Sequence, residues 1–515
     1  MSATLRRVLR ALRFALIGFG ALAASAVFAQ ALPAAWRPAV APEAFDALLR
    51  QDFYGVYIGG LKVGWTSQAL RRETVDGEPR FVSELDTQMR MVNAGVTIAS
   101  RSTERVWFDA QPPYAMRRFS TEVVQNDDRQ LSEGRFTPDG FSVSTTTRSG
   151  TQTRDAGAMD FTLVDNEVLS LWIKGGTYGA AAQKGDAPIT SRHLALDELR
   201  VRAERHRIQA EATHSRQGVA ITEVEIEVSV PHDQTRFTVG VDRANGRTLM
   251  MRNAAYEMRL EPEATAKTGG VATDLYELGK VRIDRALGEG SRIERLVLAV
   301  EGKGQPPLED GPNQTMQRDA AGLLWRITLT MKPSRTTPVT AEDEREATLD
   351  TLIHPHGKAN VQALAKEALG NDGAALTREQ TVARVVRFVN RFIKPSYTAN
   401  PLTVDDILAK REGDCSEYAR LTATLLRALG IPTREVAGLA YAGDKEKSFE
   451  LHAWNEVVLE DAAGAKYWHA IDATFNRTAV TPHYISFGAN PDAQSAGIAA
   501  ALQQFKLRVV ELQRR

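Results

Sequence analysis

The chain has 515 residues, of which 43% are hydrophobic and 25% are charged, a composition typical of a soluble globular protein. This composition excludes a largely disordered chain, a collagen and a polytopic membrane protein. The 64 Lys and Arg residues cancel the 64 Asp and Glu residues, so the chain lacks the basic surplus typical of nucleic-acid-binding proteins. At roughly 150 residues per domain, the length predicts about three domains, or two with additional segments.

Residues 1–31 have the pattern of an export signal peptide. Four arginines precede an apolar stretch over residues 14–29, and the small residues Ala29 and Ala31 suit cleavage by a signal peptidase. About 16 apolar residues are few for a transmembrane helix, which needs roughly 20. We therefore expect a periplasmic or secreted protein. The alternative is an uncleaved N-terminal anchor, which would hold the chain at the inner membrane.

Residues 45–260 are predicted to form a large antiparallel β-rich domain. Apolar residues alternate strictly with polar ones over 224–230, which is the period of a half-buried strand. Pairs such as Asp76-Gly77 and Asn245-Gly246 are typical of hairpin turns between strands. One helical interruption is expected near residues 161–173. The pattern does not reveal which ligand this domain would bind.

The remaining chain divides at a proline-containing linker over residues 332–340, where we expect the main domain boundary. Residues 261–335 before it are predicted to form a β-rich connecting region. Residues 340–490 change to helical periodicity and then to strands, and we expect them to form a separate core. Residues 491–515 are predicted to form a C-terminal helix.

Cys415 is the only cysteine, so the chain has no internal disulfide and no cysteine-based zinc site. Asp414 and Glu417 have the spacing of a capping box, which predicts that a helix begins there. Cys415 would then lie in the first turn, where free backbone N–H groups and the helix dipole favour a thiolate. The alternative is that Cys415 is a small, inert core residue.

Two segments after Cys415 predict strands, at residues 451–459 and 467–475, joined by a short turn. This hairpin would place His452 opposite Asp472, within about one residue of register and close enough for a hydrogen bond. The carboxylate would orient the imidazole, and the other ring nitrogen would face the thiol. His469 points to the opposite face of its strand and is excluded as the base.

These motifs resemble the core of the transglutaminase-like superfamily. Residues 413–415 match the Gly-Asp-Cys run that opens the nucleophile helix in that family, and residues 452–456 and 471–474 match its two other motifs. The resemblance is specific over about residues 380–480. It implies an α+β protein with a papain-like core, in which a helix bundle packs on an antiparallel sheet. A β-rich N-terminal half followed by such a core is similar to uncharacterised bacterial periplasmic proteins.

The resemblance implies a Cys-His-Asp catalytic triad. Cys415 would attack a carboxamide or peptide carbonyl, His452 would act as base and then as acid, and Asp472 would orient His452. Tyr397 is our candidate for a side-chain donor to the oxyanion beside the Cys415 backbone N–H, or else a wall residue. Trp454 would shield the His–Asp pair from water, or would be an ordinary core residue.

No metal site and no cofactor are expected. The nine histidines show no ligand spacing, and the calcium-binding loops of animal transglutaminases have no recognisable counterpart. A nucleic-acid partner has no supporting residues either.

The sequence therefore predicts an exported acyl-transfer enzyme that acts through a thioester, with a hydrolase (an amidase or peptidase) favoured over a protein cross-linker. Its substrate would be a protein, a peptide or a peptidoglycan peptide. The alternative is a non-catalytic periplasmic binding or scaffold protein with a vestigial core. The sequence specifies neither the substrate, the choice between water and an amine, the oligomeric state nor cleavage of the signal.

Overall fold

The computed structural model describes residues 34–487 and 506–515. Within this range it leaves out residues 59, 94–95, 127, 139, 149, 175–187, 197–199, 217, 230–235, 254–255, 270–279, 303–307, 309, 320–323, 334–338, 352, 371–375 and 397–401. The predicted export signal lies outside the described residues. The chain divides into two compact units, an N-terminal one up to Thr273 and a C-terminal one that begins at Asp274 and includes residues 92–97.

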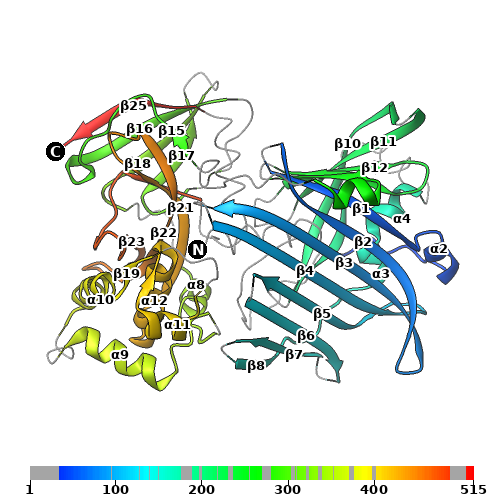
Figure 1. The fold of residues 1–515 in the computed structure, drawn as a ribbon, viewed down its shortest axis with the longest axis horizontal. Coiled ribbons are helices and arrows are strands. Elements are labelled where there is room, and N and C mark those ends of the chain that lie inside the picture. Colours follow the sequence, from blue (N-terminus) through cyan, green and yellow to red (C-terminus); the bar gives the residue numbers. More distant parts are fainter. Residues whose placement is uncertain are drawn as a thin grey trace. The chain divides into compact units, whose positions relative to one another are not determined.

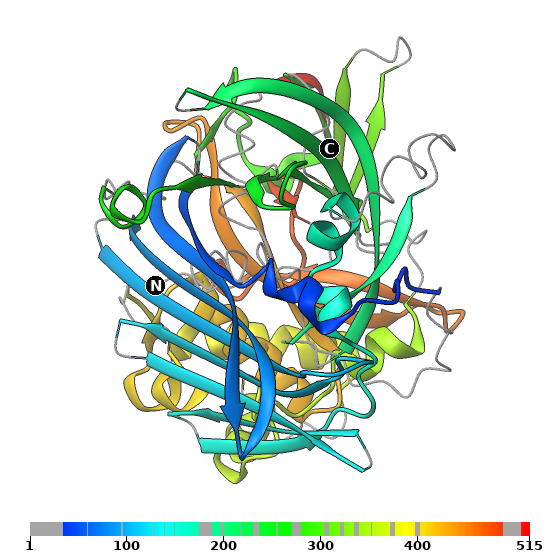
Figure 2. The ribbon, with the colours of Figure 1, turned by 90° about the vertical axis from the view of Figure 1, so that its right-hand side faces the viewer.

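The N-terminal unit contains one antiparallel sheet of fourteen strands (Figures 1 and 2). The spatial order is β8-β7-β6-β5-β4-β3-β2-β1-β14-β13-β12-β11-β10-β9. Its strands are β1 (Arg50–Ile58), β2 (Leu61–Val75), β3 (Glu78–Asn93), β4 (Val96–Asp109), β5 (Met116–Gln125), β6 (Asp128–Thr137), β7 (Gly140–Thr147), β8 (Gly150–Asp155), β9 (Ile189–Ala195), β10 (Arg200–Arg216), β11 (Val219–Ser229), β12 (Arg236–Asp242), β13 (Thr248–Arg252) and β14 (Glu257–Glu261). Figure 2 shows the long strands strongly bent.

Local sequence explains much of this sheet. Asp76 and Gly77 form the turn between β2 and β3 with φ angles of 54° and 83°, values that glycine and aspartate tolerate best. The alternating segment 224–228 forms β11, where its apolar residues pack against Trp172. The helical interruption expected near residues 161–173 is present as two short helices, α3 (Leu163–Asn166) and α4 (Val168–Lys174). The unit also contains α2 (Pro42–Asp46) and α6 (Glu263–Lys267).

The C-terminal unit contains two larger sheets and a small parallel pair (Figure 1). The five-stranded sheet consists of β15 (Val281–Arg282), β22 (Ser448–Glu460), β21 (Thr433–Tyr441) and β24 (Tyr484–Ser486), with β23 (Lys466–Ile471) also paired to β22. The four-stranded sheet has the order β17 (Gln314–Arg318), β18 (Trp325–Thr330), β16 (Ile293–Glu301) and β25 (Lys506–Arg514). The parallel pair is β19 (Lys394–Pro395) with β20 (Glu412–Gly413).

The helices of the C-terminal unit gather around α12 (Cys415–Ala428), which lies against β22 (Figure 1). They are α8 (Ala341–Glu346), α9 (Ala359–Leu369), α10 (Arg378–Phe392) and α11 (Val404–Lys410), and a short 3-10 helix spans Gly290–Arg292. The apolar stripe of α10 packs with Leu421 and Leu425 of α12 and with Val457 of β22. Among the described residues, no helix is both long enough and apolar enough to span a membrane.

The prediction of a C-terminal helix over residues 491–515 is wrong for residues 506–515, which are the part that the structure describes. Residues 506–514 form strand β25, because Leu507 and Val509 are buried in alternation with exposed neighbours, which is the period of a strand. They lie opposite Val300 and Leu298 of β16. Since β25 and residues 293–330 form one sheet, the boundary that we expected at residues 332–340 lies inside the C-terminal unit.

Gln314 joins the two larger sheets of the C-terminal unit. Its side-chain amide donates to the Ser486 carbonyl at 3.0 Å and accepts from the Ser486 N–H at 2.9 Å. Gln314 is buried, so no solvent replaces these bonds. One side chain therefore continues the backbone hydrogen bonding of β24 toward β17.

We expect Gln314→Ala to lower the free energy of unfolding by about 2 kcal/mol, because it removes two buried hydrogen bonds to the Ser486 backbone. Gln317→Ala, at an exposed position of the same strand, should stay within about 0.5 kcal/mol of the wild type. Urea unfolding of the two variants measures both values. Equal stability of the two variants would contradict this role of Gln314.

Candidate active site

Helix α12 begins in the way that the sequence predicts, with a capping box. Asp414 Oδ1 accepts from the Ser416 N–H at 2.9 Å, and Glu417 Oε2 accepts from the Asp414 N–H at 3.0 Å. Gly413 makes room for this arrangement, since a Cβ there would lie 2.3 Å from Glu417 Cβ. Cys415 is the first residue of the helix and is partly exposed.

The chain that precedes Tyr397 runs beside the segment that leads into Cys415. Lys394 and Pro395 pair in parallel with Glu412 and Gly413, and the Ser396 N–H donates to the Gly413 carbonyl at 2.9 Å. Tyr397 itself lies outside the described residues, so its role as an oxyanion donor stays a prediction.

His452 and Asp472 form a hydrogen bond of 2.8 Å between Nε2 and Oδ2. The other ring nitrogen remains for Cys415, whose thiol interacts electrostatically with the His452 imidazole. The three candidate residues thus come from three different elements. Cys415 lies at the start of α12, His452 lies in β22, and Asp472 directly follows β23.

The strand register differs from the expected one. Asn455 pairs with Ile471 at the end of β23, so the position opposite Asp472 would be Trp454, two residues beyond His452. Asp472 is no longer in the strand, and its backbone N–H and carbonyl both bond Arg477 across a turn. This turn bends the chain, so the carboxylate reaches His452 diagonally. His469, which we excluded, bonds the Thr478 carbonyl instead.

Aromatic rings surround the His452 imidazole. Phe475 stacks on it with ring centroids 5.0 Å apart, and Trp454 lies nearly parallel to it with centroids 6.2 Å apart. Phe475 is 56% exposed, whereas Trp454 is buried. Trp454 lies beside the candidate pair and packs over Gly438, where a Cβ would come within 2.4 Å of its ring, and its role as a shield from water stays a prediction.

The electrostatics of the site favour a carboxylate–imidazolium pair. Burial alone would lower the pKa of His452, but the charge and hydrogen bond of Asp472 and the bond to Cys415 outweigh it and raise that pKa to about 10. Burial alone would raise the pKa of Asp472, yet His452 and the Tyr484 hydroxyl hold it below its ordinary value. At neutral pH the acid is therefore ionised and the imidazole is protonated.

Two influences oppose each other at Cys415. Burial first, and then the Asp414 carboxylate, raise the pKa of the thiol. The His452 hydrogen bond and charge and a bond from the Ala453 N–H lower it. The balance leaves the pKa above its ordinary value, so a reactive thiolate depends on His452.

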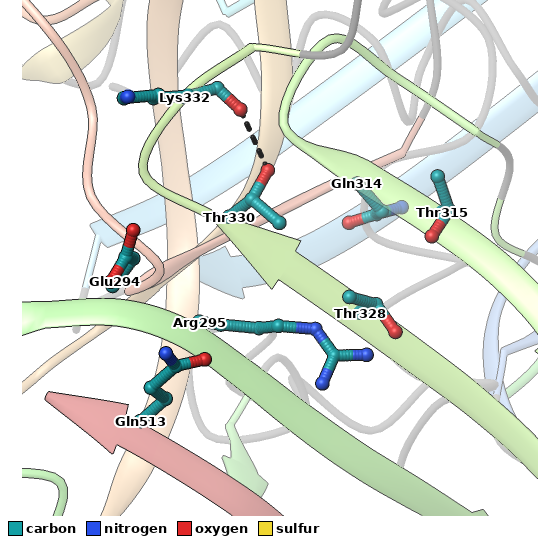
Figure 3. Close-up of a pocket in the computed structure, with 8 residues that line it drawn as sticks. All are labelled: Glu294, Arg295, Gln314, Thr315, Thr328, Thr330, Lys332 and Gln513. Atoms are coloured by element: carbon teal, nitrogen blue, oxygen red, sulfur yellow. Dashed lines mark hydrogen bonds between the residues drawn. The ribbon is translucent and has the colours of Figure 1, made fainter.

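A pocket of about 450 Å³ lies on the four-stranded sheet rather than at Cys415 (Figure 3). Its lining contains neither a cysteine nor a histidine, and the Thr330 hydroxyl at its edge donates to the Lys332 carbonyl at 2.8 Å. The lining residues are Glu294, Arg295, Gln314, Thr315, Thr328, Thr330, Lys332 and Gln513. Over the described part of the chain, no three His, Cys, Asp or Glu side chains are grouped as metal ligands.

The segment that contains Cys415, His452 and Asp472 matches a known protein family. Residues 362–473 match the family model of the transglutaminase-like superfamily. Residues 362–473 form a transglutaminase-like domain. Cys415, His452 and Asp472 all lie within it, and the described chain as a whole is β-rich with a large antiparallel sheet.

Individual relatives are distant. The chain is 29% identical over 163 residues to a protein-glutamine gamma-glutamyltransferase from Pseudomonas aeruginosa, a match that covers 28% of this chain and 22% of that protein. A proposed cysteine protease from Cytophaga hutchinsonii is 14% identical, with a TM-score of 0.25 and coverage of 43% of this chain and 86% of that one. A β-barrel-like protein of a domain family of unknown function from Brucella abortus is 11% identical, with a TM-score of 0.28 and coverage of 41% and 94%. Scores this low support no argument about function.

Sequence reasoning missed three residues that contact the candidate site: Phe475, Arg477 and Tyr484. The Tyr484 hydroxyl donates to Asp472 Oδ2 at 2.7 Å from a different strand, β24. None of the three lies in a motif with characteristic spacing. Only the hairpin turn after Asp472 could have drawn attention to Phe475.

We expect Asp414→Asn to speed alkylation of Cys415 at neutral pH by about tenfold, the equivalent of one pKa unit. The substitution removes the negative charge beside the sulfur, while the Asn oxygen can still cap the helix. The measurement is the rate of reaction with iodoacetamide against pH. Asp343→Asn, which removes a charge from the N-terminal turn of α8, is the matched control and should leave the rate unchanged. A slower reaction in Asp414→Asn would contradict the opposing role of Asp414.

Proposed function

We propose that the transglutaminase-like domain is a thiol-dependent acyl-transfer enzyme with Cys415 as nucleophile, His452 as acid and base, and Asp472 as the group that orients His452. The observation that carries the proposal is the 2.8 Å hydrogen bond from His452 Nε2 to the buried Asp472 carboxylate, with the imidazole close enough to Cys415 to lower the pKa of its thiol. Nucleophile, base and orienting acid are the groups that this chemistry requires.

The proposed reaction begins when the Cys415 thiolate attacks the carbonyl carbon of an amide. Negative charge develops on the carbonyl oxygen near the backbone N–H at the start of α12, which supports it. The C–N bond then breaks, and the leaving amine takes its proton from the His452 imidazolium. A thioester remains on Cys415, and His452 is neutral and able to act as a base.

Water or an amine then attacks the thioester and gives up a proton to His452. The C–S bond then breaks, which releases a carboxylic acid or a new amide and regenerates the Cys415 thiolate beside the His452 imidazolium. We favour water, since Cys415 is partly exposed to solvent. The likeness to a protein-glutamine gamma-glutamyltransferase supports a carboxamide or peptide as the substrate, either in a protein or in a peptidoglycan peptide.

We also propose that the enzyme acts in the periplasm or outside the cell, released or anchored at its N-terminus. The basic and apolar pattern of residues 1–31 supports this location. Cell fractionation and the mass of the mature chain check it.

The activated thiol is tested by alkylating Cys415 with iodoacetamide across pH, in the wild type and in His452→Ala. The chain has no other cysteine, so the alkylated product reports one residue. We expect the wild-type thiol to react faster at neutral pH than the thiol of His452→Ala, because His452 lowers the pKa of Cys415 against the raising effects of burial and Asp414. His452→Ala should react at least about tenfold more slowly, because only the Ala453 N–H then opposes burial and Asp414 at the thiol.

His469→Ala is the matched control, because it removes a histidine from the neighbouring strand that bonds only the Thr478 carbonyl among the described contacts. It should react as the wild type does. Equal alkylation rates of Cys415 in the wild type and in His452→Ala would overturn the enzyme proposal. It would favour instead a non-catalytic binding or scaffold protein.

The resolving nucleophile is tested with peptides that contain carboxamide side chains, with and without an added primary amine. We expect hydrolysis, seen by mass spectrometry as deamidated or cleaved peptide, and no product in Cys415→Ala. Efficient incorporation of the amine into the peptide would contradict our preference for water and identify the protein as a cross-linking transferase.

A further inference from the structure

The Asp472 carboxylate accepts four hydrogen bonds. Oδ1 accepts from the Thr474 N–H at 2.7 Å and from the Phe475 N–H at 3.4 Å, both within its own turn. Oδ2 accepts from His452 Nε2 at 2.8 Å and from the Tyr484 hydroxyl at 2.7 Å. Asp472 is fully buried, so the turn holds one oxygen and two residues from other strands hold the other.

Tyr484 can take up few other positions. Its ring meets Trp454 edge-on, with centroids 5.3 Å apart at 81°, and meets His452 at 5.9 Å and 62°. Its backbone is paired with Ala440 of β21. Burial and the neighbouring carboxylate raise the pKa of the Tyr484 hydroxyl well above its ordinary value, so the phenol keeps its proton. It therefore serves only as a donor to the ionised Asp472.

Arg477 completes the arrangement from the other side. Its backbone N–H donates to the Asp472 carbonyl at 2.7 Å and its carbonyl accepts from the Asp472 N–H at 2.8 Å. The charge of its guanidinium lies close enough to the Tyr484 hydroxyl to lower the pKa of that group. A nearby positive charge makes a hydroxyl a stronger donor, because it favours the loss of electron density from the O–H bond.

We propose that Tyr484, supported by Arg477, is a positioning residue that aims Asp472 Oδ2 at His452 and so sets the reactivity of Cys415. This inference rests on the proposed function, since it assigns Tyr484 an effect on the same thiol. Without the phenol, Oδ2 would be free to turn away from the imidazole plane, while Oδ1 would stay fixed by the turn. The imidazolium would then stabilise the thiolate less well.

The groups around Tyr484 limit other causes of a pH effect. Asp472, His452 and Arg477 are the charged partners already described. Burial and then the charge of Arg477 lower the pKa of the adjacent His483 to about 4, so His483 remains neutral throughout a titration above pH 5. A shift in the pH profile of Cys415 on changing Tyr484 would therefore report on the Asp472–His452 pair.

The test is the rate of Cys415 alkylation by iodoacetamide against pH in the full chain, for the wild type, Tyr484→Phe and Tyr441→Phe. Tyr441→Phe is the matched control, because its hydroxyl also donates to a carboxylate, Asp444, at 2.9 Å, but Asp444 is exposed and does not bond His452 in the described structure. We expect Tyr484→Phe to move the inflection to higher pH and to slow alkylation at pH 7 by about tenfold. Tyr441→Phe should keep the wild-type profile. Thermal unfolding of all three confirms that they are folded.

The outcomes separate this inference from the proposed function. If His452→Ala has the same pH profile of Cys415 alkylation as the wild type, the proposed function itself is overturned. If the profile changes in His452→Ala but Tyr484→Phe has the wild-type profile, Tyr484 contributes only to packing and the inference is overturned. An inflection at lower pH would overturn it as well, because the hydroxyl would then compete with His452 for the carboxylate.

Arg477→Met provides a second variant should Tyr484→Phe fail to fold. It keeps the backbone bonds to Asp472 and removes only the guanidinium from Tyr484. We expect a shift in the same direction as in Tyr484→Phe but smaller, and Arg477→Lys should restore part of it. No shift in Arg477→Met would contradict the supporting role of Arg477.

Discussion

The ionised carboxylate of Asp472, buried away from water, is the constraint on which the candidate site depends. A buried charge is costly unless hydrogen bonds and an opposite charge compensate it. Here the compensation comes from its own turn, from His452 on β22 and from Tyr484 on β24. Each partner must be held in place for the carboxylate to remain ionised, so the need to satisfy one charge fixes three segments of the chain relative to one another.

The four-stranded sheet contributes to the same arrangement at a distance. Gln314 binds both backbone groups of Ser486, and Ser486 ends the short strand that carries Tyr484. A three-residue edge strand has few hydrogen bonds of its own, so this side chain supplies a substantial part of its attachment. Gln314, which lies 172 positions before Ser486 in the sequence, thus helps to place the phenol that bonds Asp472.

The start of α12 combines two opposing electrostatic demands. A carboxylate at the N-cap stabilises the helix, because it satisfies free N–H groups and complements the dipole. The same charge disfavours a thiolate one residue later, so the imidazolium of His452 must compensate for it. This opposition explains why the arrangement of His452 and Asp472 matters more to Cys415 than the helix terminus alone.

The sequence by itself determined the local features: the capping box before Cys415, the hairpin that carries His452 and Asp472, and the turns and alternation of the large sheet. Each depends on side chains a few residues apart, whose spacing is visible in the sequence. The tertiary structure alone decided the two-residue offset between His452 and Asp472, the contribution of Tyr484 and Arg477, and the strand at residues 506–514. Those features depend on which distant segments pack together. Hydrogen bonds between β22, β24 and the turn after β23 form only once the five-stranded sheet is assembled, and no local period encodes them.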